Sequence, residues 1–80
     1  MKAKIHVTLK TGVLDPQGAA IQNSLINLGI KEVAEVKQGK YFEMEFSTED
    51  KSTAERLTEQ ACKELLANQV IENYRYEVCD

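Results

Sequence analysis

Residues 9–18, LKTGVLDPQG, constrain the fold more than any other stretch of this 80-residue chain. They lie where the pattern of apolar residues changes from strand-like to helix-like. Gly12 allows a backbone turn that other residues resist, and Asp15 can cap a helix by accepting hydrogen bonds from its first N–H groups. Pro16 suits the first helical position, where its missing N–H costs nothing. The stretch therefore predicts a rigid strand-to-helix corner, without a nucleophile beside a base or a phosphate-binding glycine fingerprint.

The first half of the chain predicts a strand, a helix and a second short strand. Lys2 to Lys10 alternates apolar and polar residues, which predicts a strand with one buried face. Pro16 to Leu28 is expected to be a helix that ends at Gly29, and its apolar stripe consists of Ile21, Leu25 and Leu28. Val33 to Gln38 is predicted as a second strand, followed by a tight turn at Gln38-Gly39.

The second half predicts a strand, a helix and a final strand. Tyr41 to Ser47 alternates, with Phe42, Met44 and Phe46 pointing inward. Ser52-Thr53-Ala54-Glu55 has the form of a capping box and is expected to begin a helix that runs to about Leu66. The residues expected on the core side of that helix are Ala54, Leu57, Ala61 and Leu65. Asn73 to Cys79 is predicted as the last strand.

The expected order is β-α-β-β-α-β in a single domain covering residues 1–80. This order is typical of the α+β class and of the split-βαβ, or ferredoxin-like, arrangement: an antiparallel sheet with two helices on one face. The first strand is then expected between the third and the fourth, with the second at an edge. The open sheet face would bring Lys4, His6 and Thr8 beside Tyr41 and the charged residues Glu43, Glu45, Arg75 and Glu77.

Composition excludes several classes of protein. The net charge of −3 argues against a nucleic-acid binder, which normally carries a basic face. No run approaches the ~20 apolar residues of a membrane span, and Met1 to Lys4 does not begin like a signal peptide. Two cysteines, Cys62 and Cys79, are too few for a disulfide framework. A cytoplasmic protein with reduced thiols is therefore expected.

No catalytic, cofactor-binding or metal-binding residues are predicted. His6 is the only histidine, and it has no cysteine, serine or aspartate at a motif spacing. A metal site would need three or four convergent ligands. Cys62 and Cys79 lack the nearby positive charge that activates a thiol. Cys62 is therefore expected to pack on a helix flank, and Cys79 to be exposed without a functional role.

The chain resembles the PurS family, the small subunit of phosphoribosylformylglycinamidine (FGAM) synthase. The resemblance rests on Val7 to Gly18, Leu28-Gly29, Gly39-Lys40 and the run Ala67 to Tyr74. One residue departs from the family pattern: Gln69 stands where the family usually has proline. The match covers nearly the whole chain, and its most specific part is the block from Gly12 to Ala20.

The resemblance implies a non-catalytic assembly subunit in de novo purine (IMP) biosynthesis. The complete enzyme converts formylglycinamide ribonucleotide, ATP and glutamine into formylglycinamidine ribonucleotide, ADP, phosphate and glutamate. PurQ, the glutaminase, releases ammonia, and PurL, the large synthetase subunit, uses it. The small subunit is expected to bridge them and to aid ammonia transfer. ATP, Mg²⁺ and glutamine belong to the partners, and self-association as a dimer or tetramer is expected.

The resemblance and the corner together suggest where partners dock. Gly18 early in a helix weakens that helix by up to ~1 kcal/mol relative to alanine, which suggests that another backbone or side chain approaches closely. Lys40 beside the predicted turn either keeps the turn soluble or contacts the large subunit or an anion. The candidate docking residues are Gly12, Val13, Leu14, Asp15, Pro16, Gln17, Gly18, Gly39, Lys40 and Tyr74.

Two other functions fit the same order of elements. A regulatory module of the ACT type would bind a small-molecule effector near the first loop, but only similarity of fold supports this alternative. A small enzyme such as an acylphosphatase would need an arginine in the loop after the first strand. The loop from Thr11 to Gly18 has none, because the two arginines are Arg56 and Arg75.

Overall fold

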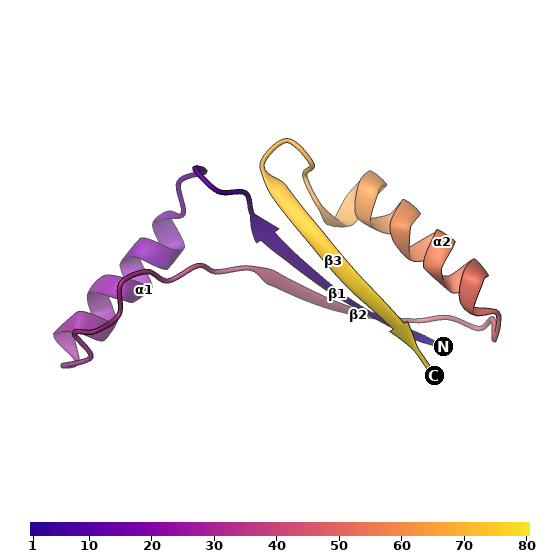
Figure 1. The fold of residues 1–80 in the computed structure, drawn as a ribbon, viewed down its shortest axis with the longest axis horizontal. Helices are drawn as coiled ribbons and strands as arrows, with labels where there is room; N and C mark the ends of the chain where they lie inside the picture. The colour runs from indigo at the N-terminus through magenta and orange to yellow at the C-terminus, as the bar shows by residue number, and fades with distance from the viewer.

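The computed structural model describes residues 1–80 as three strands and two helices (Figure 1). Strand β1 (Lys2–Leu9) leads to helix α1 (Pro16–Asn27), and strand β2 (Lys40–Glu45) leads to helix α2 (Lys51–Ala61). A π-helical turn, η1 (Cys62–Leu66), extends α2, and strand β3 (Glu72–Cys79) ends the fold. None of the helices combines the length and the apolar character needed to cross a membrane.

The sheet is antiparallel with the order β2-β1-β3, so β1 is central, as predicted. Ile5 pairs with Phe42 on one side and Tyr76 on the other, and Ala3 pairs with Met44 and Val78. All these side chains share the inner face, because side chains of paired residues point to the same side of a sheet. The predicted α+β class and the alternation of all three strands are confirmed.

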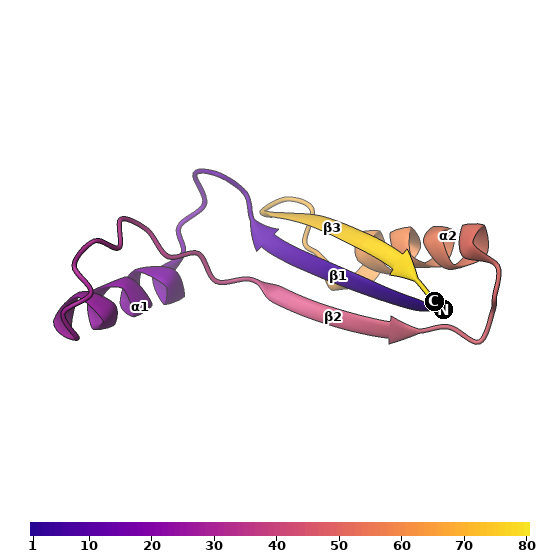
Figure 2. The ribbon, with the colours of Figure 1, turned by 60° about the horizontal axis from the view of Figure 1, so that its bottom comes forward.

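Helix α2 covers the inner face of the sheet over β1 and β3 (Figure 2). The core contains Ala3, Ile5 and Val7 of β1 together with Ala54 and Cys62 of the helix, all fully buried. Thr58 is also buried, and its hydroxyl donates to the carbonyl of Ala54 at 2.7 Å. This hydrogen bond satisfies the hydroxyl group and makes a polar residue acceptable in the core.

The core side of α2 differs from the prediction at Thr58 and Cys62, which are buried, and at Leu65, which is exposed. The buried positions are Ala54, Thr58 and Cys62, whereas Leu65 is 81% exposed. A π-helical turn contains more residues than an α-helical turn, so side chains beyond Cys62 rotate relative to the 3.6-residue pattern. The residue before the helix is Asp50 and not Ser52, and the hydroxyl of Ser52 donates to the Asp50 carboxylate at 3.2 Å.

The predicted strand from Val33 to Gln38 does not form. Residues 33–39 adopt no regular secondary structure and pair with no strand, and the chain enters β2 at Lys40 without a hairpin turn. Backbone groups of this segment bond to side chains of the first helix region: Val33 and Ala34 to Gln22, and Gln38 to Asp15. The polar side chains thus take the place of a neighbouring strand.

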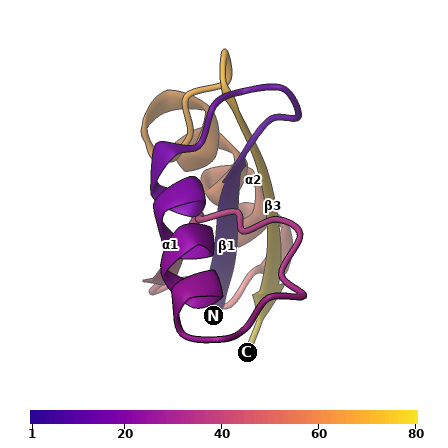
Figure 3. The same cartoon turned by 90° about the vertical axis from the view of Figure 1, so that its left-hand side faces the viewer.

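Helix α1 does not lie on the sheet face, contrary to the expectation of two helices on one side. It projects beyond the end of the sheet, beside the 33–38 segment (Figures 1 and 3). We call residues 16–38 the arm, and the sheet with α2 and η1 the body. The arm makes the molecule elongated, with extents of 48 × 26 × 14 Å. The corner after β1 holds the arm in this position.

Candidate partner-docking surface

The predicted corner is present and begins with a tight turn after β1. Gly12 has φ +89°, a conformation that glycine adopts without strain, and the N–H of Val13 donates to the carbonyl of Lys10 at 3.1 Å. Asp15 caps α1 by accepting a hydrogen bond from the Gly18 N–H at 2.8 Å, and Pro16 occupies the first helical position. The residue types of the corner therefore carry out the structural roles expected of them.

Asp15 has a second partner that the sequence does not reveal. Its other carboxylate oxygen, Oδ2, accepts the N–H of Gln38 at 3.0 Å, across 23 residues of chain. The hydrogen bonds from Gln38 and Gly18 stabilise the charged form and lower the pKa of Asp15 below its usual 3.8. One side chain thus joins the start of α1 to the segment that enters β2.

The close contact between the start of α1 and residues 33–38 also requires a glycine at position 18. A Cβ atom at this position would lie 2.1 Å from the carbonyl oxygen of Val36, a distance that no neighbour can accept without moving. The predicted close approach is correct, but the approaching group belongs to this chain. Gln22 adds a further link by donating to the carbonyl oxygens of Val33 at 3.3 Å and Ala34 at 2.8 Å. We call the contacts of Asp15, Gly18 and Gln22 with residues 33–38 the clasp.

A hollow of about 460 Å³ opens beside the corner. Its walls are the loop from Leu9 to Asp15, one side of α1, and residues 35–37. The predicted docking residues Gly12, Val13 and Leu14 line it, and Leu14 is 89% exposed. At its rim, Lys37 forms an ion pair with Glu35 at 3.6 Å. The hollow lies at the first loop, where an ACT-like module would bind its effector.

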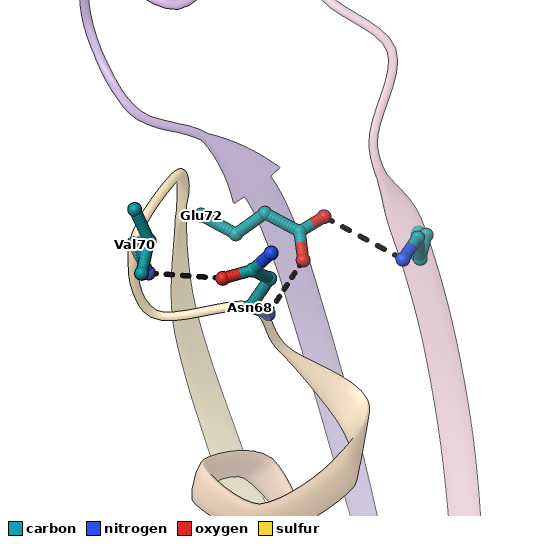
Figure 4. Close-up of polar contacts among 4 residues, drawn as sticks. Asn68, Val70 and Glu72 are labelled. Carbon is teal, nitrogen blue, oxygen red and sulfur yellow. Dashed lines mark hydrogen bonds and ion pairs between the residues drawn. The ribbon is translucent and has the colours of Figure 1, made fainter.

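Lys40, predicted as a docking or anion-binding residue, has a partner within the chain. Its Nζ lies 3.5 Å from Oε2 of Glu72, whose side chain is only 10% exposed. Oε1 of Glu72 accepts the N–H of Asn68 at 2.7 Å (Figure 4). Glu72 therefore ties the loop before β3 to the first residue of β2, which explains Lys40 without an external partner. Gly39 is packed as tightly, because a Cβ there would lie 2.5 Å from the Val7 carbonyl oxygen.

The loop from Asn68 to Ile71 is held firmly, yet its apolar side chains face solvent. The side chain of Asn68 accepts the N–H of Val70 at 3.1 Å (Figure 4). The carbonyl of Ile71 accepts the N–H of Lys10 at 2.8 Å, which joins this loop to the corner after β1. Val70 is 83% exposed and Ile71 is 38% exposed. Gln69, which replaces the expected proline, donates to the Lys63 carbonyl at 3.4 Å.

Tyr74, the last predicted docking residue, is also engaged internally. Its hydroxyl donates to Glu59 of α2 at 2.8 Å, and Lys63 pairs with the same carboxylate oxygen at 3.5 Å. The hydrogen bond to Glu59, together with burial and the negative charge of Glu59, raises the pKa of Tyr74 to about 12. The contact fastens α2 to β3 and gives the hydroxyl a partner within the chain.

The open sheet face has the charge pattern predicted for it. Lys4 lies between Glu43 and Glu77 in the strand register, and the ring of His6 lies 4.8 Å from that of Tyr41. The Tyr41 hydroxyl donates to Glu43 at 2.9 Å. These contacts are those of a stabilised sheet surface, and none of them places a base beside a nucleophile.

The other candidate reactive groups are not arranged for chemistry. Cys62 is fully buried, and burial raises the pKa of its thiol, which lowers the fraction of reactive thiolate. Both cysteines are free thiols. No three histidine, cysteine, aspartate or glutamate side chains converge in a way that would hold a metal ion.

The predicted docking residues therefore fall into two groups. Gly12 to Gly18 lie together at the corner, while Lys40 and Tyr74 lie in strands of the body, Gly39 directly precedes β2, and all three make internal contacts. Sequence reasoning missed the exposed apolar residues that no part of the chain covers, notably Leu28, Ile30, Leu65 and Val70. The signal for Leu28 was available, since an apolar stripe on α1 needs a covering surface.

Comparison with known proteins links this geometry to one family. Residues 2–80 match the family model described as PurS: Phosphoribosylformylglycinamidine (FGAM) synthase. The chain is 47% identical over 77 residues to the PurS subunit of Bacillus subtilis, covering 96% of this chain and 90% of the relative.

Solved structures of this family share the fold. A crystal structure of B. subtilis PurS superposes with a TM-score of 0.87 at 46% identity, covering 99% of this chain and 98% of that one. A chain in the structure of PurLQS from Thermotoga maritima gives a TM-score of 0.86 at 33% identity, covering 95% and 93% of the two chains.

Proposed function

Because this chain belongs to the PurS family of FGAM synthase subunits, we propose that it is a non-catalytic assembly subunit that bridges PurL and PurQ. The observation that carries the proposal is the match over residues 2–80 to a family with a member in the PurLQS structure. In this role the chain belongs to a glutamine-dependent, ATP-consuming ligase of purine biosynthesis, without catalysing a step by itself.

The contacts of the chain support an architectural role. Asp15, Lys40 and Tyr74 each bond to another part of the same chain, so their polar groups build the shape of the molecule. The exposed groups include large apolar side chains such as Leu14, Leu28 and Val70. Large apolar side chains left exposed on so small a chain favour contacts with other proteins. We therefore assign ATP, Mg²⁺ and glutamine to the partner subunits.

Three further parts of the proposal concern how the subunit works. It aids the passage of ammonia from PurQ to PurL by keeping the two subunits in register. It associates with itself as a dimer or tetramer. It acts in the cytoplasm, where the two free thiols of Cys62 and Cys79 remain reduced.

The test is reconstitution with PurL and PurQ from the same organism. FGAM formation is measured with glutamine and, separately, with ammonium chloride as the nitrogen source, in the presence and absence of this chain. We expect glutamine-dependent activity to need the chain, and ammonia-dependent activity to need only PurL, because only the first requires PurQ to be held in place.

A co-purification experiment completes the test. Tagged PurL should retain PurQ only when this chain is present, with ADP, Mg²⁺ and glutamine in the buffer. Equal glutamine-dependent rates with and without the chain would refute the bridging role. Turnover by the isolated chain would refute its non-catalytic character.

A further inference from the structure

The open face of the sheet has no helix over it. Helix α2 packs against β1 and β3 on the inner face, and Figure 2 shows it on one side of the sheet only. The open face therefore presents the outward side chains of all three strands. An antiparallel sheet can leave such a face in water, so the side chains on the face decide whether it has a further role.

One row of side chains crosses the open face at the same level. The strand register places Tyr41 of β2 and Arg75 of β3 on either side of His6 of β1. The rings of His6 and Tyr41 lie 4.8 Å apart, Tyr41 is 50% exposed, and Arg75 is also exposed. We call these three residues the open-face row. Tyrosine and arginine are enriched in protein interfaces and among the residues that contribute most to binding.

Arg75 has no ion-pair partner within the chain. The basic residues that do form ion pairs are Lys2, Lys37, Lys40 and Lys63. The neighbour of Arg75 across the strand is His6, which supplies no negative charge. The guanidinium is therefore available to bind a carboxylate through two parallel hydrogen bonds, the geometry that its planar fork favours.

A hollow of about 240 Å³ lies beside Arg75. It is lined by Lys4, His6, Arg75, Tyr76 and Glu77. Two positive side chains, Lys4 and Arg75, thus border it against a single carboxylate, that of Glu77. The hollow is smaller than the roughly 300–1,000 Å³ of typical small-molecule sites. It therefore suits one side chain of a larger partner better than a free ligand.

We propose that the open-face row docks a partner subunit of the synthase, and that an aspartate or glutamate of that partner enters the hollow and binds Arg75. The inference rests on the bridging role proposed above and names a surface for it. In this contact Tyr41 and His6 provide the flat aromatic area beside the ion pair, and the guanidinium of Arg75 gains the carboxylate that its own chain does not supply.

The neighbouring row sets the charge pattern that the partner must match. In that row Lys4 lies between Glu43 and Glu77 in the strand register, so its net charge is negative. The two rows are two residues apart along each strand, which is about 7 Å. A partner with a carboxylate opposite Arg75 and a cation opposite Glu77 is therefore complementary, and this alternation would fix its orientation.

The same pattern argues against a second copy as the occupant. A two-fold axis through His6 would place the open-face row of one copy against the same row of the other. That row contains no carboxylate, so Arg75 would be covered without gaining a negative charge. Covering an unpaired charge is costly, whereas a different protein can supply the missing group.

The test measures the dissociation constants of the full chain for PurL and for PurQ, with ADP, Mg²⁺ and glutamine present. Arg75→Ala should weaken binding to one of the two partners at least about tenfold, as for a central interface arginine. Arg75→Lys should give a smaller loss, because lysine keeps the charge but not the planar fork. Circular dichroism and urea unfolding should match wild type.

Arg56→Ala is the matched control. Arg56 is the only other arginine of the chain, is exposed, and lies on α2 and not on the open face. Its substitution should leave both dissociation constants within about threefold of wild type. Added salt should weaken binding of the wild-type chain more than that of the Arg75→Ala chain, since only the first retains the ion pair.

Photo-crosslinking locates the contact. Benzoylphenylalanine replaces Tyr41 in one chain and Arg56 in a control chain, and each is irradiated in the complex with PurL and PurQ. The chain with the probe at position 41 should crosslink to the partner whose affinity depends on Arg75. The chain with the probe at position 56 should give no such product.

Three results would overturn the proposal. One is an Arg75→Ala chain that binds both partners like wild type. Another is a chain in which the substitution changes self-association, measured by sedimentation, and not partner binding. The third is competition of wild-type binding by millimolar free glutamate or phosphate, which would make the hollow a small-anion site. In each case PurL can still retain PurQ through this chain, so failure of the open-face contact is distinguishable from failure of the bridging role.

Discussion

The body and the arm are held together by different forces. The body has a core in which Ile5, Val7 and Cys62 are fully buried, so the hydrophobic effect stabilises it. The arm buries only Gly18 and is fixed by hydrogen bonds from Asp15 and Gln22. Each such bond adds little net stability, because water competes for the same groups. Together, however, they fix the orientation of α1 relative to the sheet.

This difference separates folding from assembly. The buried core lies in the body, while the clasp sets where α1 points. A short chain buries a smaller fraction of its surface than a long one, and this chain leaves one helix uncovered instead of adding it to its own core. The arm is therefore the part whose stability should depend most on neighbouring molecules.

The largest effect is expected from the centre of the body. Ile5→Ala removes a fully buried side chain that pairs with Phe42 and Tyr76, and we expect it to lower the free energy of unfolding by about 3 kcal/mol. Ile21→Ala in the arm, where the side chain is 39% exposed, should cost less than about 1 kcal/mol in the dissociated chain. Urea unfolding at low protein concentration measures both. Equal losses would remove the distinction between the two regions.

The next prediction tests the clasp by asking whether Gly18→Ala stabilises or destabilises α1. Helix propensity alone predicts that Gly18→Ala stabilises α1 by up to about 1 kcal/mol. The clash with the Val36 carbonyl predicts instead a loss of about 2 kcal/mol, confined to the arm. Hydrogen exchange should show faster exchange in α1 and unchanged exchange in β1.

Ser24→Ala, at an exposed position of the same helix, is the control and should leave exchange nearly unchanged. Slower exchange of α1 amides in Gly18→Ala would show that the close approach to Val36 is not rigid.

A smaller, pH-dependent effect follows from Asp15. Its pKa in the folded chain is below the ordinary 3.8, because it accepts hydrogen bonds from Gln38 and Gly18. The stabilisation is therefore present above pH 3.8 and is lost as the pH falls through the lowered value. Protection of α1 amides should decrease with acid in that range, as measured by NMR hydrogen exchange.

Asp15→Asn should remove this pH dependence from α1. Asp50→Asn, at the start of α2, is a matched control, because the pKa of Asp50 is also lowered, by the hydroxyls of Thr53 and Ser52. Its substitution should leave the pH dependence of α1 intact. A wild-type arm with no change in protection below pH 3.8 would contradict the role given to Asp15.

The smallest effect is expected from the ion pair between Lys40 and Glu72. Glu72→Gln keeps an acceptor for the Asn68 N–H and removes only the charge. Because Lys40 is 58% exposed, the loss should be under about 1 kcal/mol in thermal or urea unfolding. Lys40→Met should give a similar loss. A large decrease in PurL binding with unchanged stability would instead place Lys40 in a partner contact.

Local features were predictable from the sequence because local forces produce them. The alternation in β1, the cap at Asp15 and the first helical position of Pro16 depend on neighbours a few residues away. The strand expected at Val33 to Gln38 failed because Gln22 and Asp15 bond its backbone, and no local pattern identifies those partners. The exposure of Leu65 depends on the π-helical turn, which disturbs the 3.6-residue period.

The candidate surface was predictable only in part: the sequence indicated which residues are special, but not what they contact. Gly18 correctly indicated a close approach, but the pattern could not show that Val36 of the same chain makes it. Lys40 and Tyr74 were predicted as docking residues because they match the family pattern, and the structure gives each an internal partner. The position of α1 could not be predicted, because an apolar stripe requires cover without specifying which chain provides it.

The most direct measurement is hydrogen exchange of α1 and β1 amides as a function of protein concentration. If a second copy covers α1, protection in α1 should rise as the chain passes from monomer to dimer, while protection at Ile5 and Val7 stays nearly constant. Equal protection of α1 at all concentrations, in a chain shown to change from monomer to dimer, would contradict the claim that the arm is completed by another molecule.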